Sequence, residues 1–215
     1  MGGGVSCRVW CTRRARHPRQ GLDAVRDGRV PRGAGLGLPL LDLPGRYAAL
    51  FRFSRGAGLP DAVPDFLGLA VRVVDAGGPG RHQDFLLDTG SSLPVLRRLP
   101  LPRRDLLRVT YSSLLPFQAA QRRLLIGAQP VGAASCQSLQ ALPAALPVRL
   151  RLLLGRLPGG WQPLAELVAS DVLPAPAGRQ IQFSPHTCVS GLAPVGRLNQ
   201  WRRGAYDASH VGPDT

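Results

Sequence analysis

Glycine and proline are spread so densely along this chain that long helices have little room to form. Of the 215 residues, 26 are glycine and 21 are proline. Both favour turns, because glycine adopts backbone angles closed to other residues and proline lacks a backbone N–H. The apolar fraction, 44%, is enough for one buried core. The sequence therefore predicts a single domain over residues 17–215, preceded over residues 1–16 by a disordered lead or a misplaced start.

Apolar residues at every second position predict several strands. In Tyr47–Ser54 the alternation puts the aromatic side chains on one face and Leu50, Arg52 and Ser54 on the other. The other predicted strands are Leu69–Val74, Asp84–Leu87, Val148–Leu154, Trp161–Ser170 and Arg179–Phe183. Helical pieces are expected at Arg103–Leu115, Ser138–Leu146 and Gly196–Ser209. Because strands dominate, the predicted class is α+β, mainly β, with a barrel decorated by helices.

The charge of the chain is strongly positive, and it comes entirely from arginine. The 27 basic residues include no lysine, and the formal net charge is +14. A basic surface attracts polyanions, but these arginines are scattered and no RNA-reading aromatic motif accompanies them. A GC-rich genome also favours arginine, alanine, glycine and proline codons. We therefore expect no nucleic-acid partner.

The cysteines and the hydropathy bear on location. The four cysteines are Cys7, Cys11, Cys136 and Cys188. The Cys7–Cys11 spacing has no second pair to complete a zinc site, so free thiols in a reducing cytoplasm are expected, although Cys7 and Cys11 could pair as a disulfide. No stretch approaches the ~20 apolar residues that span a bilayer, so no membrane partner and a cytoplasmic location are expected.

Three short blocks resemble conserved blocks of the haem-dependent catalases, in the same order and at close to the same spacing. Catalases carry A-R-F-S, D-P-R-G-F-A-V-K-F and G-N-N-x-P-V. The corresponding blocks here are Leu50-Phe51-Arg52-Phe53-Ser54, Asp65-Phe66-Leu67-Gly68-Leu69-Ala70-Val71-Arg72-Val73 and Gly90-Ser91-Ser92-Leu93-Pro94-Val95. The chain thus resembles a short and divergent catalase-like protein. The resemblance implies a catalase-like antiparallel β-barrel and haem as the cofactor.

The resemblance also assigns roles on the distal side of the haem. It implies that Arg52 binds a haem propionate and that Ser54 holds the distal histidine. Two residues apart on a strand, both side chains point to one side, and a carboxylate suits the guanidinium fork. His17, in His17-Pro18-Arg19-Gln20-Gly21, stands where the family has H-A-R-G, and a distal histidine moves a proton between the two peroxide oxygens. The alternative is a surface arginine beside a strand-end serine, with an exposed histidine.

A motif near the end of the chain suggests the iron ligand. Catalases carry R-x-x-x-Y, and this chain has Arg202-Arg203-Gly204-Ala205-Tyr206. The resemblance implies that Tyr206 binds the haem iron as a tyrosinate. Arg202, four residues earlier on a helix, shares its face and would stabilise the phenolate. The alternative is an exposed end of a helix.

One departure bears on the activity. Where catalases have a distal asparagine, which donates from its amide to peroxide, this chain has Ser91 or Ser92. A hydroxyl is shorter and orients peroxide less well, and the chain is much shorter than a full catalase. The implied function is therefore peroxidase-like or oxygen-transfer activity on a small peroxide or hydroperoxide, rather than efficient peroxide disproportionation. The oligomeric state stays open.

Two further hypotheses remain. Asp88-Thr89-Gly90-Ser91-Ser92 looks like the aspartic protease signature, and Leu124-Leu125-Ile126-Gly127 resembles the apolar element behind that loop. A protease of this kind would be a homodimer, since its catalytic aspartate shares a proton with a second one. The other hypothesis is a non-catalytic barrel that has lost haem. Asp61 and Asp65 stand among turn residues and are expected to bind loop backbone rather than to form an acid–base pair.

Overall fold

The computed structural model describes residues 35–43, 45–90, 99–132, 134–156, 159–174 and 180–195, together with the backbone of 4–13. Its strands are β1 (Gly4–Arg13), β2 (Gly45–Arg55), β3 (Leu67–Val73), β4 (Gln83–Gly90), β5 (Thr110–Ser112), β6 (Phe117–Ala119), β7 (Arg122–Pro130), β8 (Val148–Arg156), β9 (Trp161–Val172) and β10 (Leu192–Pro194). The helices are α1 (Pro39–Asp42) and the 3₁₀ helix η1 (Leu142–Ala145). None of the described helices is long and apolar enough to cross a membrane.

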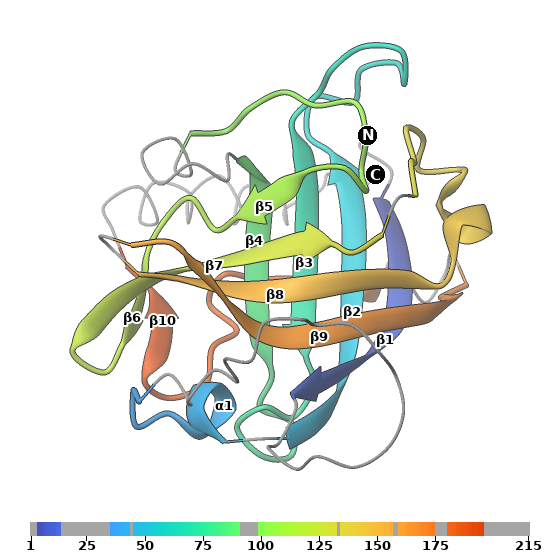
Figure 1. The fold of residues 1–215 in the computed structure, drawn as a ribbon. Helices are drawn as coiled ribbons and strands as arrows, with labels where there is room; N and C mark the ends of the chain where they lie inside the picture. Colours follow the sequence, from blue (N-terminus) through green and yellow to red (C-terminus); the bar gives the residue numbers. More distant parts are fainter. Residues whose placement is uncertain are drawn as a thin grey trace, which may run out of the picture.

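The strands form one antiparallel sheet that curls into a barrel. Its order is β10-β6-β7-β5-β4-β3-β2-β1-β9-β8, and an additional pairing of β7 with β8 closes the ring. Strands β7 to β9 cross β2 to β4 steeply, so two layers face each other (Figure 1). Strands β6 and β10 continue the sheet beside β7 (Figure 1). The predicted mainly β, antiparallel barrel is confirmed.

The interior of the barrel is an apolar core built by alternation along the strands. On β2, Phe51 and Phe53 are fully buried, with ring centroids 5.4 Å apart. Tyr111 of β5 packs on Phe53 at 5.9 Å. Other members of the core are Leu69, Val71, Phe85, Leu87, Leu124, Ile126, Leu150, Leu152 and Leu167. Since every second residue points inward, the intervening residues of β2, β3 and β4 lie on the outside of the barrel.

The loop between β2 and β3 is organised by a buried ion pair. Asp65 is 1% exposed and accepts hydrogen bonds from the backbone N–H groups of Ala57, Leu59 and Phe66. Arg55, 6% exposed, lies 3.7 Å from this carboxylate and donates to loop carbonyls, that of Val63 at 2.7 Å among them. The expectation that Asp65 binds loop backbone is confirmed.

The start of the chain differs from the sequence-based expectation. Residues 1–16 were expected to be a disordered lead, but the backbone of Gly4–Arg13 forms β1. This strand pairs with β2 on one side, with Val5 opposite Phe53, and with β9 on the other, with Cys11 opposite Leu167. The backbone N–H and C=O groups of a strand between two neighbours find partners on both sides, which favours the extended chain here.

Two expected helices and one expected strand are wrong. Within Arg103–Leu115 only β5 is regular, because side chains hold the backbone in turns: Asp105 accepts from the N–H of Leu107 at 2.8 Å, and Tyr111 donates to the carbonyl of Leu106 at 2.9 Å. Ser138–Leu146 contains only the short η1. From residue 180 the predicted strand Arg179–Phe183 is irregular, and the predicted helix Gly196–Ser209 lies outside the described residues.

Candidate functional site

The outer face of β2, β3 and β4 carries the residues of interest in two rows. One row runs Arg52, Ala70, Leu86 across the three strands, and the next runs Ser54, Gly68, Asp88. Each of these residues is half-buried, whereas their strand neighbours Phe51 and Phe53 are fully buried in the barrel. The structure therefore brings Arg52 and Ser54 to one face, with small residues beside them on β3.

Gly68 makes room on this face for the side chain of Ser54. A Cβ added to Gly68 would stand 2.5 Å from the Ser54 Oγ and 3.9 Å from the Asp88 Oδ1. The space beside Gly68 is thus occupied by the Ser54 hydroxyl, with the Asp88 carboxylate close by. Any other residue at position 68 would force the Ser54 side chain to move. The glycine of the second sequence block accordingly has a steric role in holding the Ser54 hydroxyl between β2 and β4.

Arg52 is held in place by residues 181–183, which contact it on the same face. Its Nη2 donates to the carbonyl oxygen of Ile181 at 2.8 Å, and its guanidinium carbon lies 5.1 Å from the ring centroid of Phe183. Burial, and then the neighbouring charge of Arg72, lower the pKa of Arg52 from its ordinary value. A guanidinium remains protonated in proteins, so Arg52 keeps its charge and its forked donors.

Arg72 and Asp84 form a tight pair next to Arg52. Arg72 Nε and Nη2 donate to the two carboxylate oxygens of Asp84, each at 2.7 Å. Asp84 is fully buried, and the hydrogen bond to Asp84 raises the pKa of Arg72 above its ordinary value. The guanidinium carbon of Arg72 lies 5.3 Å from the Phe183 ring centroid. Both arginines thus lie against the same aromatic ring, and one of them, Arg72, is paired with the Asp84 carboxylate.

Five of the residues singled out in the sequence lie outside the described residues. These are His17, expected on the distal side, Arg202 and Tyr206, expected at the iron, and Ser91 and Ser92. Their roles therefore stay predictions. Arg52 and Ser54 are described, and they share one face as expected.

The Asp-Thr-Gly segment closes β4. Thr89 is fully buried; its Oγ1 donates to the carbonyl of Leu101 at 2.7 Å and accepts from the N–H of Leu67 at 3.2 Å. This threonine therefore joins the end of β4 to the start of β3. The apolar stretch Leu124–Ile126 is buried in β7, and β5 lies between β7 and β4.

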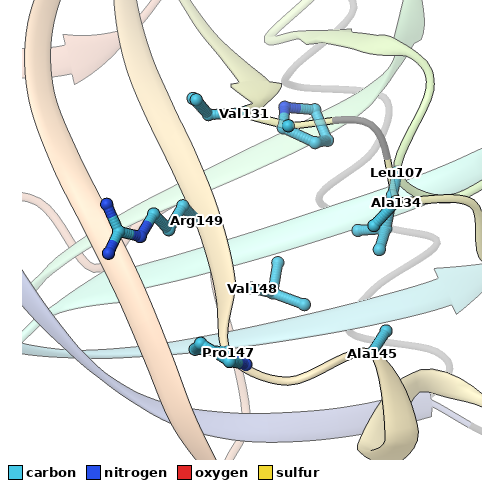
Figure 2. A pocket seen from close by; sticks show the side chains of 9 residues that line it. Leu107, Val131, Ala134, Ala145, Pro147, Val148 and Arg149 are labelled. Atoms are coloured by element: carbon cyan, nitrogen blue, oxygen red, sulfur yellow. The ribbon is translucent and has the colours of Figure 1, made fainter. Parts of the chain in front are cut away.

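The rest of the described residues offer fewer groups that could bind a ligand or react. Among the described residues no group of three or more His, Cys, Asp or Glu side chains could hold a metal ion. A small pocket beside the start of β8 is lined by apolar residues and Arg149, whose side chain extends away from Val148 (Figure 2). Its lining holds no acid, base or nucleophile.

The sequence did not point to four residues that shape the site: Gly68, Arg72, Asp84 and Phe183. A signal existed for two of them, because Arg72 and Asp84 break apolar strands at positions that alternation places on the outside. The contact of Phe183 with both arginines had no local signal, since it joins residues more than a hundred positions apart in the chain.

The comparisons with known proteins support the fold alone. No protein-family model matches the chain, and no curated protein sequence matches it. Among solved structures, the chain is similar to the crystal structure of a fungal catalase, with a TM-score of 0.58 and 12% sequence identity. The similarity covers 98% of this chain but only 58% of the fungal chain, so this chain spans little more than half the length of that catalase. The chain therefore has a catalase-like β-barrel fold.

Proposed function

We propose that the outer face of β2 to β4 binds haem and that the haem-bound protein has peroxidase-like or oxygen-transfer activity on a small peroxide or hydroperoxide. The observation that carries this proposal is the shared, half-buried face of Arg52 and Ser54 beside the small residues Gly68 and Ala70. This face belongs to a catalase-like barrel, and the sequence blocks that contain these four residues follow the order of the catalase blocks.

The described residues fit such a cofactor. The place of a side chain at Gly68 is taken by the short Ser54 hydroxyl, and the neighbouring Ala70 is small, so no bulky group of β3 keeps a flat ring from approaching the strands; Leu86 adds apolar surface. A guanidinium has five N–H donors in a fork that matches a carboxylate, so Arg52 can bind a propionate while keeping its hydrogen bond to Ile181. When bound, haem would supply the iron that activates the peroxide O–O bond.

The chain would supply the remaining groups as follows. Tyr206 would hold the iron, and Arg202 would stabilise its phenolate form, because a nearby cation lowers the pKa of a phenol. Ser54 would orient the imidazole of His17 by a hydrogen bond, which selects the ring nitrogen that carries the proton. His17 would then move a proton from one peroxide oxygen to the other. The roles of His17, Arg202 and Tyr206 rest on the sequence resemblance.

Reconstitution with hemin tests the proposal. The full chain, titrated with hemin to one equivalent, should develop a Soret band that Tyr206→Phe loses or shifts strongly. Tyr47→Phe, a change of the same size on β2, is the matched control and should keep the band. A wild-type chain without a Soret band at stoichiometric hemin would favour the non-catalytic barrel and overturn the proposal. A Soret band unchanged in Tyr206→Phe would overturn the assignment of Tyr206 as the iron ligand but not the proposal that the chain binds haem.

No contact among the described residues favours the homodimeric aspartic protease. Such an enzyme needs the Asp88 carboxylate of two copies to share a proton. Thr89, the second residue of the signature, already has a role within one chain, since it joins β4 to β3.

A further inference from the structure

The segment 181–189 crosses the outer face next to Arg52 without regular structure. It is fastened to β3 and β4 mainly by side chains, with one backbone hydrogen bond from the Asp84 N–H to the Thr187 carbonyl and no strand ladder. Arg72 Nη2 donates to the carbonyl of Gln182 at 2.6 Å. The N–H of Val189 donates to the side-chain oxygen of Gln83 at 3.0 Å. The position of this segment therefore depends on a few polar side chains of β3 and β4.

Asp84 has the largest part in that fastening. One of its oxygens, Oδ2, accepts from Arg72 at 2.7 Å and from the N–H of Ser184 at 2.9 Å, and the other accepts from Arg72 at 2.7 Å. Its own N–H donates to the carbonyl of Thr187 at 2.8 Å. A fully buried carboxylate with three donors has a single favourable orientation, so the segment is fixed relative to β4.

The segment 181–189 in turn restricts the orientation of the Arg52 guanidinium. The carbonyl of Ile181 accepts from Arg52 Nη2, and the Phe183 ring lies 5.1 Å from its guanidinium carbon. Ile181 and Phe183 stand on either side of Gln182, which is bound by Arg72, and Phe183 directly precedes Ser184, which is bound by Asp84. A carbonyl acceptor on one edge and an aromatic ring against the group restrict the rotation of a long side chain that would otherwise sample many rotamers. The orientation of the Arg52 guanidinium is therefore restricted.

We propose that Asp84 is a positioning residue for Arg52: through Arg72 and the segment 181–189 it aims the Arg52 guanidinium at a carboxylate group of the ligand bound on this face. The proposal rests on the proposed haem function for the identity of that ligand, a porphyrin with free propionates. Asp84 itself is buried beneath the segment and would not touch the ligand. Its effect should therefore depend on whether the ligand carries a carboxylate.

The test compares hemin with hemin dimethyl ester, in which both propionates are uncharged. The wild-type chain should bind hemin at least about tenfold more tightly than the ester, since a charged hydrogen bond is lost in the ester. In Asp84→Asn and in Phe183→Leu this ratio should fall toward one, with the affinity for the ester changed less than about threefold. Phe183→Leu leaves the Arg72–Asp84 pair intact and keeps the test valid if Asp84→Asn folds poorly. The matched control Asp171→Asn, an exposed aspartate on β9, should keep the ratio of the wild type.

A second measurement needs no haem. In the free protein, hydrogen exchange of the Ser184 amide should be at least about tenfold faster in Asp84→Asn, while amides of β8 stay unchanged. Unchanged exchange, or an unchanged hemin-to-ester ratio in both Asp84→Asn and Phe183→Leu, would overturn the positioning role. Equal weakening of hemin and ester would show a purely structural role instead. A wild-type chain that binds neither ligand overturns the proposed function and the role of Arg52 together, whereas faster exchange in Asp84→Asn would still show that Asp84 holds the segment.

Discussion

Replacing Gly68 by alanine would test the geometry of the candidate site most directly. The new methyl group would stand 2.5 Å from the Ser54 Oγ, closer than a Cβ atom approaches another heavy atom in folded proteins. Overpacking of this kind costs about 1–3 kcal/mol. The gain from a less flexible unfolded chain offsets about 0.4–1 kcal/mol of it. Because Ser54 is short and can rotate, we expect a net loss of about 1 kcal/mol, or about 2–4 °C in Tm for a chain of this size.

The assay is urea denaturation followed by circular dichroism, with a double-mutant cycle to isolate the clash. Ser54→Ala removes the crowded oxygen, so Gly68→Ala should cost little in that background, and the coupling should be about 1 kcal/mol. Gly160→Ala is the matched control, since nothing lies within 4 Å of its added Cβ, and it should be neutral or slightly stabilising. The steric clash between position 68 and Ser54 would be refuted if Gly68→Ala were as stable as the wild type. It would also be refuted if Gly68→Ala cost as much stability in the Ser54→Ala background as in the wild type.

Three more predictions concern the barrel and the loop between β2 and β3. Phe53→Ala should lower the free energy of unfolding by about 3–5 kcal/mol in urea, because the fully buried ring leaves a cavity. Gly127→Ala should lower the Tm, since its Cβ would stand 2.8 Å from the Trp161 ring. Burial alone would raise the pKa of Asp65, but backbone hydrogen bonds and Arg55 hold that pKa below its ordinary value. This stabilisation should be complete above the unfolded-state pKa of about 3.9 and be lost as the pH falls through the lower folded value, and Asp65→Asn should flatten that part of the pH–stability profile.

The strands with one buried face were predictable from the sequence. In Tyr47–Ser54 and from Val148 to Leu152 the alternation is clean, because each stretch has a core side and an outer side; beyond a register shift at Leu152/Leu153, Leu153 is buried as well. The β7 strand was not predicted, because Leu124, Leu125 and Ile126 are all buried and a strand buried on both faces shows no alternation. Glycine and proline density predicted the class correctly but could not separate turns from helices at Arg103–Leu115.

Only the part of the candidate site that comes from residues close together in the sequence was predictable. Arg52 and Ser54 are two residues apart on one strand, so their shared face follows from the period of a strand. The contacts of Arg52 with Ile181 and Phe183 depend on how distant segments fold together, and the position of residues 181–189 is set by buried polar side chains. Local patterns carry no information on such pairings.

The place of β1 between β2 and β9 has a consequence for how the chain folds. Strands β2, β3 and β4 follow one another and pair as neighbours, so they can assemble from local contacts. Cys11 of β1, however, pairs with Leu167 of β9, nearly the whole barrel away along the sequence. Contacts of such long sequence separation are slow to form, because a long loop of chain must be closed before they contribute. During synthesis the edge of β1 that later meets β9 therefore stays unpaired until β9 has been made, and in that interval it can pair with a strand of another chain.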